Sequence, residues 1–235
     1  MTPCLVREKG SFMLKNIIDD GFRPELVETA LFDGTLEIPT IRKPDKMVIP
    51  KTMVPFSCRS RSNTKESFVA FYEHDIRFAD VLTSTDEYLD DLKHFAGVVS
   101  PDCSLYRDMP LCLQIANTYM NRSVGHYLQT QGLYVVPNIR WSDERTYTTC
   151  CLPEKIAFLG VEKHSIVSVG TYGCIRGKEN RYHFRAGIEA MLNELEPEIV
   201  LVYGSMPDDL FHGLLHRTRF VQYPDWITLK KREVI

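Results

Sequence analysis

The chain is predicted to be an α/β protein in which parallel strands alternate with helices. Two observations carry this prediction. From Ser67 onward, short apolar runs typical of buried strands recur at a spacing of roughly thirty residues, and several of the segments between them place apolar residues at helical spacing. Since crossovers between parallel strands are right-handed, this alternation favours a small or incomplete TIM-like β/α barrel, with a doubly wound open parallel sheet as the alternative.

Length and composition fit one large domain with a sizeable core, at 235 residues of which 44% are hydrophobic and 25% charged. A formal charge of -3 gives no general electrostatic footprint for nucleic acid, so a nucleic-acid partner is an open alternative that the net charge does not indicate. Seven cysteines without a CxxC pair predict free thiols in a reducing cytosol. With no apolar run long enough for a bilayer, we expect a cytoplasmic protein without a membrane partner.

The sequence pattern changes near residue 65. Residues 1–65 are predicted to form an irregular arm with short strands at 36–38 and 53–56, because prolines interrupt the apolar runs there. Residues 66–235 form the predicted α/β domain that carries the site. The basic cluster Arg59, Arg61 and Lys65 is interpreted as a solvated loop, with a phosphate-binding patch as the alternative.

The elements of the domain follow from its apolar patterns. Strands are predicted at 68–72, 97–100, 133–136, 165–169, 199–203 and 219–223. Helices are predicted over 85–95, from a cap at Asp108 to Gly132, over 179–196, and for a short stretch from Asp208. Asp108 is interpreted as a helix N-cap and Ser205 as the start of a capping box, which explains both residues without a site.

Polar segments follow most of the predicted strands. In either architecture ligands bind beyond the carboxyl ends of parallel strands, so these segments should meet at one edge of the sheet. The segments are 73–75, 101–108, 137–145, 170–178 and 204–205. This recurrence predicts a site at that edge.

Three residues are candidates for acid/base chemistry there. Asp102 and Asp143 would form a carboxylate pair, and His74 follows the first strand. Each has an ordinary alternative, since an Asp after a strand often binds loop amides. The histidines show no metal-ligand spacing, so no metal site is predicted, and no cofactor motif is recognised.

A second set of residues is predicted to bind a small phosphorylated or nucleotide-like ligand. Arg140 and Arg176 would clamp an anion, and Trp141 and Tyr106 would stack on a base or sugar. Cys174, near a predicted helix start, is a candidate for a lowered pKa but not for a nucleophile, because no partner His is identifiable. The full set is Ser104, Tyr106, Arg107, Asn117, Asn138, Arg140, Trp141, Thr171, Cys174, Arg176 and Tyr203.

Four stretches of the chain are similar to a known family. SPDCSLYRDMPLCLQIANTYMNR, GLYVVPNIRWSDERTY, SIVSVGTYGCIRGKENRYHF and IVLVYGSMP resemble the DUF4417 family, a domain of unknown function in bacteria, archaea, phages and plasmids. The resemblance covers the chain from about Met47 onward. It implies a protein that travels with phages and mobile elements, and it brings no activity, substrate or cofactor.

Three functions stay open at this point. The first is an enzyme that processes a phosphorylated or nucleoside-like ligand. The second is a non-catalytic binder that sequesters nucleotides or inhibits a host defence factor. The third is a nucleic-acid-binding accessory protein that uses Arg59, Arg61, Lys65 and the Arg140 loop.

Overall fold

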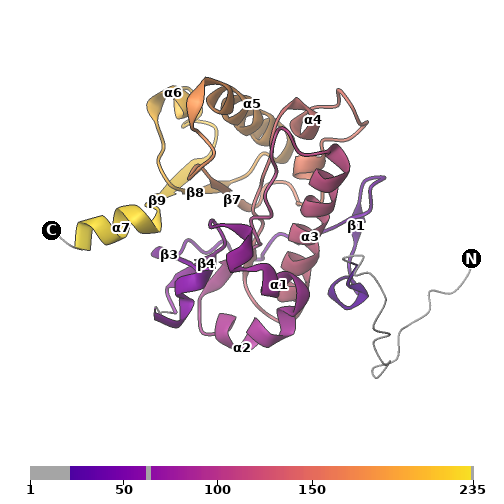
Figure 1. Ribbon diagram of the computed structural model, residues 1–235, viewed down its shortest axis with the longest axis vertical. Helices are drawn as coiled ribbons and strands as arrows, with labels where there is room; N and C mark the ends of the chain where they lie inside the picture. The colour runs from indigo at the N-terminus through magenta and orange to yellow at the C-terminus, as the bar shows by residue number, and fades with distance from the viewer. Residues whose placement is uncertain (1–21, 62–64, 234–235) are drawn as a thin grey trace, which may run out of the picture.

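The computed structural model describes residues 22–61 and 65–233 and shows two parallel sheets with helices packed against them (Figure 1). The strands of the first sheet, in spatial order, are β3 (Thr52–Pro55), β4 (Ser67–Ala70), β5 (Gly97–Val99) and β6 (Val135–Val136). Those of the second are β7 (Ile166–Gly170), β8 (Ile199–Tyr203) and β9 (Arg219–Tyr223). A short antiparallel pair, β1 (Phe32–Asp33) and β2 (Ile38–Pro39), lies before them.

Helices connect the strands. The α-helices are α1 (Ala79–Thr83), α2 (Leu89–Leu92), α3 (Leu111–Thr130), α4 (Glu144–Tyr147), α5 (Gly177–Leu195), α6 (Asp208–Phe211) and α7 (Trp226–Glu233). Single 3-10 turns occur at η1 (Pro24–Leu26), η2 (Phe56–Arg61), η3 (Asp75–Arg77), η4 (Thr85–Tyr88) and η5 (Ile156–Phe158). Within the described part of the chain, no helix has both the length and the apolar character to cross a membrane.

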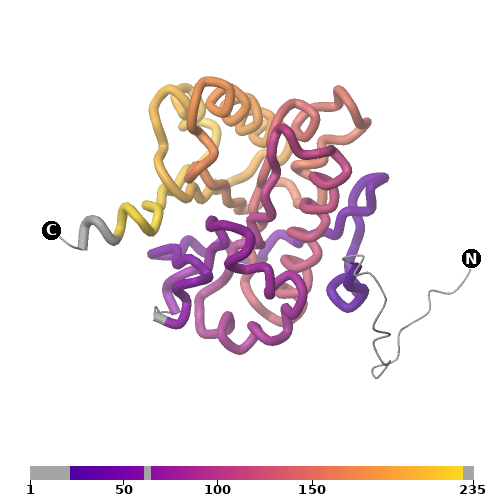
Figure 2. Tube along the Cα trace, viewed as in Figure 1, coloured from indigo at the N-terminus to yellow at the C-terminus, as the bar shows by residue number. Residues whose placement is uncertain are grey.

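A parallel bridge joins the two sheets directly after β6. Asn138 pairs with Ser168 of β7, the N–H of Ile139 donates to the Ser168 carbonyl at 2.8 Å, and the N–H of Ser168 donates to the Pro137 carbonyl at 2.9 Å. Seven parallel strands therefore follow one another in chain order. The tube trace shows the same division, with β3 and β4 in the lower part of the view and β7 and β8 above them (Figure 2).

The α/β class is confirmed, and the barrel is not. Strand order is sequential within each sheet, without the reversal that marks a doubly wound sheet. Among the described residues β9 does not pair with β3, so the strands do not close into a ring. The segment Thr52–Pro55, expected in the N-terminal arm, pairs along its length with β4 and is the edge strand of the first sheet.

Successive side chains along each strand point to opposite faces of the sheets, and both faces are apolar. Outward residues of β4–β6 pack with α1–α3, and those of β7 and β8 pack with α5 and α6. On the inner face Tyr72, just beyond β4, stacks on Tyr203 of β8 with ring centroids 5.0 Å apart. The inner cluster takes side chains from all seven strands, among them Met53, Phe68, Val99, Val136, Ile166, Leu201 and Tyr223. One core thus joins both sheets.

Helix starts are where the sequence predictions were wrong. Pro110 is the N-cap of α3 and Pro207 the N-cap of α6, each with extended ψ and without a side-chain cap bond. Asp108 and Ser205 therefore do not cap these helices, because the prolines hold the cap positions and the helices begin later than expected. The helix predicted over 85–95 is a 3-10 turn followed by the four-residue α2.

The buried face of α3 holds one fully enclosed cation. Arg122 is 1% exposed and donates to the backbone carbonyls of Leu159, Ala157 and Asn138 at 2.9, 3.1 and 2.8 Å, and to Asn121 Oδ1 at 2.6 Å. Burial lowers the pKa of Arg122 to about 10, which leaves it charged at neutral pH. This guanidinium ties α3 to the segment after β6 and to the 3-10 turn η5.

Replacing Arg122 should therefore be costly. In Arg122→Met three backbone carbonyls lose Arg122 as a donor, and we expect the free energy of unfolding to fall by about 3 kcal/mol or more. Urea denaturation measures the loss. The exposed Arg77→Met is the matched control and should change stability by less than about 0.5 kcal/mol. A loss below about 1 kcal/mol in Arg122→Met would contradict this role.

Gly125 lies where α3 packs tightly against Ile41 and Ser100. A Cβ at this position would lie 2.3 Å from Ile41 Cδ1 and 3.0 Å from Ser100 Cβ. We expect Gly125→Ala to destabilise by about 1–3 kcal/mol from overpacking, although helix propensity alone would add about 1 kcal/mol of stability. Combining it with Ile41→Val, which removes the clashing methyl, should recover about 1 kcal/mol in a double-mutant cycle. A stabilised Gly125→Ala variant would contradict the packing.

Candidate functional site

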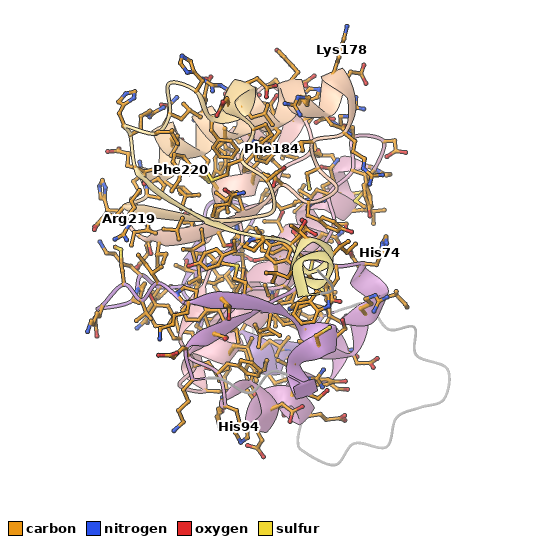
Figure 3. All side chains as sticks on the ribbon, turned by 90° about the vertical axis from the view of Figure 1, so that its left-hand side faces the viewer. His74, His94, Lys178, Phe184, Arg219 and Phe220 are labelled. Atoms are coloured by element: carbon orange, nitrogen blue, oxygen red, sulfur yellow. The ribbon has the colours of Figure 1, made fainter. Side chains whose placement is uncertain are left out.

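A pocket of about 590 Å³ opens beyond the carboxyl ends of β5, β6 and β7. Its walls come from residues 105–108, 139–142, 169–170 and 173–174, together with Asn180 and Phe184 of α5. Figure 3 shows the common direction of the strands, with His74 after β4 on the right and Arg219, which begins β9, on the left. The loops that follow three neighbouring strands thus meet at one edge, as parallel strands require.

Arg140 is the charged centre of this pocket. Its Nη1 donates to Asp102 Oδ2 at 3.1 Å and to Cys174 Sγ at 3.0 Å. Asn138 Nδ2 donates to the other oxygen of Asp102 at 2.7 Å, and Tyr72 donates from its hydroxyl to Asn138 Oδ1 at 3.0 Å. The chain of hydrogen bonds from Tyr72 through Asn138 and Asp102 therefore holds the Arg140 side chain in place, and Arg140 itself lines the cavity.

Burial and charge pairing shift the pKa values of Asp102 and Arg140 in opposite directions. Burial raises the pKa of Asp102, and the Arg140 charge and the Asn138 hydrogen bond offset only part of that rise. Burial alone would lower the pKa of Arg140, but the charge of Asp102 holds it above its usual value, so the guanidinium stays charged. The site thus combines a fixed cation with a carboxylate that is easier to protonate than usual.

The aromatic wall is held by α5. Trp141 is buried, packs on Phe184 with ring centroids 5.4 Å apart, and donates from Nε1 to the His183 carbonyl at 3.1 Å. A Cβ on Gly187 would lie 2.2 Å from that Nε1, so the helix approaches the indole as closely as glycine allows. Tyr106, in contrast, is 53% exposed and lines the pocket from the loop after β5.

Cys174 lines the pocket, but its electrostatics differ from the expected ones. The helix α5 begins at Gly177, so Cys174 is not at the helix start. Burial raises its pKa, and the charge of Arg140 offsets this only in part. Its Sγ also donates to the Tyr172 carbonyl at 3.4 Å. The expectation of a lowered pKa is therefore wrong, and a neutral thiol lies in the pocket wall.

Among the described residues, the three predicted acid/base residues make no direct contact with one another. Asp143 caps α4 by accepting from the Arg145 N–H, and the Arg145 side chain pairs with it at 2.8 Å. Burial would raise the pKa of Asp143, but these Arg145 contacts lower it. His74 is exposed beside η3, and neither His74, Asp102 nor Asp143 lines the pocket.

Most of the other predicted residues support loops. Ser104 donates from its N–H and hydroxyl to Asp75 at 3.0 and 2.7 Å, and Asn117 Nδ2 donates to the Ser104 carbonyl at 2.6 Å. Thr171 Oγ1 donates to the Ser205 carbonyl at 2.8 Å. Tyr203 accepts from the Trp226 N–H, and Arg176 is the exposed N-cap residue of α5. Of the predicted ligand-binding set, Tyr106, Arg107, Arg140, Trp141 and Cys174 line the pocket.

Sequence reasoning missed three residues of the lining, Asn180, Phe184 and Asp108. Asn180 and Phe184 lie one turn apart on α5 and face the cavity together, a spacing that the helical pattern contains. Asp108 lines the pocket from the loop after β5 and had been assigned to helix capping. Across the described residues, no group of three or more His, Cys, Asp and Glu side chains is arranged to hold a metal ion.

The basic cluster near residue 60 is partly engaged within the protein. Arg59 pairs with Asp91 at 3.2 Å, and its guanidinium carbon lies 4.0 Å from the centroid of the Phe56 ring. Lys65 is exposed, and the side chain of Arg61 lies outside the described part of the structure. A nucleic-acid partner stays a prediction.

Parallel strands in chain order with a pocket at their carboxyl ends define an α/β protein with a strand-end site. The chain belongs to the DUF4417 family, because the model of that domain of unknown function matches residues 30–224. It is similar to the Gene 1 protein of Mycobacterium phage D29, with 28% identity over 166 residues, and to that of Mycobacterium phage L5, with 27% identity over 173 residues.

These matches cover 70% and 72% of this chain. The chain spans 57% of the length of the D29 protein and 72% of that of the L5 protein. No solved structure matches the chain. The comparisons thus establish a family with phage members and leave the chemistry of the pocket to be argued from its residues.

Neutralising Arg140 tests the electrostatics of the site. In Arg140→Gln the buried Asp102 loses its charged partner, and we expect a loss of about 3 kcal/mol in the free energy of unfolding at pH 7. The pKa of Asp102 should rise further, because Arg140 is the main group that lowers it. Asp102 then takes up a proton more readily in the folded than in the unfolded chain, so the loss should shrink as the pH falls below that folded pKa.

The measurement is urea denaturation across pH 4–8 with carboxyl NMR titration of Asp102. Arg107→Gln is the control, because Arg107 is not among the groups that shift the pKa of Asp102. A pKa of Asp102 that falls or stays constant in Arg140→Gln would contradict the pairing.

Proposed function

We propose that this chain binds a small phosphorylated, nucleotide-like ligand in the strand-end pocket. The observation that supports the proposal most is Arg140. Its Nη1 is held by Asp102 and Cys174, while its Nε and Nη2 have no hydrogen-bond partner among the described residues. A planar guanidinium held in one orientation suits bidentate binding of a phosphate.

The rest of the lining fits the same class of ligand. A volume of about 590 Å³ lies within the range of small-molecule sites. The exposed ring of Tyr106 offers a face for a base, and Asn180 offers an amide without a hydrogen-bond partner among the described residues. Arg107, paired with Glu179 at the surface, adds a second cation at the wall.

We propose that the ligand is bound in the cytoplasm. The pocket would then lie at the carboxyl edge of seven parallel strands that form an incomplete TIM-like barrel. In this proposal no catalytic role falls to Asp143, which caps α4 and pairs with Arg145. Asp102 acts by orienting Arg140. Mass spectrometry of the ligand after incubation separates an enzyme from a sequestering protein, since a sequestering protein returns the ligand unchanged and an enzyme does not.

Calorimetric titration with the four ribonucleoside 5′-monophosphates, the matching nucleosides and inorganic phosphate tests the proposal. We expect saturable binding of at least one monophosphate, and binding at least tenfold weaker for the nucleoside that lacks the phosphate. Bound monophosphate should also protect Cys174 from iodoacetamide, read site by site by mass spectrometry. If no monophosphate binds or protects, the proposal is wrong.

Two substitutions locate the binding. Arg140→Lys keeps a charge for Asp102 but loses the planar fork, so we expect monophosphate affinity to fall about tenfold while the fold is kept. Tyr106→Ala removes the stacking face and should also cost about tenfold. Tyr182→Ala is the matched control, because Tyr182 is 68% exposed and lies outside the lining. Equal effects of Tyr106→Ala and Tyr182→Ala would place the ligand elsewhere.

A further inference from the structure

Asp108 places a carboxylate in the pocket wall that the fold itself does not use. It is exposed in the loop after β5 and lines the cavity. It is not the cap of α3, because Pro110 occupies that position. Among the described residues its side chain has no hydrogen bond or ion pair. Its two oxygens are therefore available to a molecule in the cavity.

Three arginines in the loops after β5 and β6 are already paired with other carboxylates. Arg140 pairs with Asp102 at 3.1 Å, Arg107 with Glu179 at 2.7 Å and Arg145 with Asp143 at 2.8 Å. Asp108 is left as an acceptor-only group that faces the cavity. Such a group binds hydroxyl or amine donors and repels phosphate. It should therefore contact a part of the ligand other than the anionic part.

The pocket lining thus carries two groups of opposite charge. Arg140 offers free N–H donors to an anion, and Asp108 offers oxygen acceptors to donors. Tyr106 lies two residues before Asp108, and its exposed ring also lines the cavity. A nucleoside monophosphate carries the matching groups in one molecule, namely a phosphate, a base and the vicinal hydroxyls of a ribose.

We propose that Asp108 binds the ribose hydroxyls of the ligand and selects ribonucleotides over 2′-deoxyribonucleotides. This inference rests on the proposed function and deepens it. A carboxylate accepts both hydroxyls of the diol through its two oxygens, and loss of the 2′-hydroxyl leaves one oxygen without a donor. Hydrogen bonds to a charged acceptor are among the stronger ones, so we expect a preference of tenfold or more.

The test compares ribonucleoside and 2′-deoxyribonucleoside 5′-monophosphates by calorimetry on the full chain. The wild type should bind the ribose form at least tenfold more tightly. In Asp108→Ala the ribose form loses two hydrogen bonds and the deoxyribose form only the one from its 3′-hydroxyl, so the ribose form should weaken more, until the two affinities lie within about threefold. Asp108→Asn keeps one acceptor and should be intermediate.

Asp90→Asn is the matched control, since Asp90 is an exposed carboxylate on α2 and lies outside the pocket lining. It should keep the wild-type preference. If the wild type binds both sugars equally, or if Asp108→Ala weakens both in parallel, the role of Asp108 is overturned while binding in the pocket stands. If neither monophosphate binds the wild type, the proposed function itself fails.

Discussion

The buried guanidinium of Arg122 is the interaction on which the central part of this molecule depends. It donates to carbonyls of the segment after β6 and of the turn η5, so one side chain of α3 fixes the backbone at the junction of the two sheets. Asn138 lies at that junction. Its carbonyl accepts from Arg122 and its amide donates to Asp102, which in turn holds Arg140. The position of the pocket cation thus follows from a contact deep in the core.

This arrangement explains why a polar row runs through an otherwise apolar interior. A buried charge is costly unless its partners satisfy it, and both Arg122 and Asp102 are enclosed by donors or acceptors of matching kind. The raised pKa of Asp102 shows that burial is not fully compensated there. Local instability of this kind is common where a protein keeps a charged group oriented toward a cavity. The apolar clusters on the two faces of the sheets supply the stability that permits it.

Much of the architecture could be predicted from local patterns. The strands β8 and β9 were predicted with their observed bounds, and α5 to within two residues at its start, because their apolar repeats are long and bounded by Pro or Gly. The convergence of the loops after β5, β6 and β7 followed from parallel strand direction alone. Short helices such as α4 were missed, since four residues contain barely one turn of periodicity.

Side-chain roles were harder to predict than positions. An Asp after a strand can cap a helix, pair with an arginine or face a cavity, and the choice depends on contacts between residues far apart in the chain. Asp143 turned inward to α4 and Arg145, whereas Asp108, assigned to capping, faces the pocket. Ring closure likewise depends on whether β9 meets β3, which no local pattern reports. The sequence therefore predicted at which edge of the sheet the pocket lies, but not the role of each carboxylate around it.

The single bridge between Asn138 and Ser168 also bears on how the molecule is assembled. Each sheet is built from a continuous stretch of chain, so the first can pair its strands during synthesis before the second has emerged. The cavity takes its walls from both stretches, on either side of that joint. It therefore cannot exist until Phe184 has been added and α5 has docked on Trp141. Any molecule that fills the cavity will act as a clamp across the joint, favouring the fully assembled chain over forms in which the halves have separated.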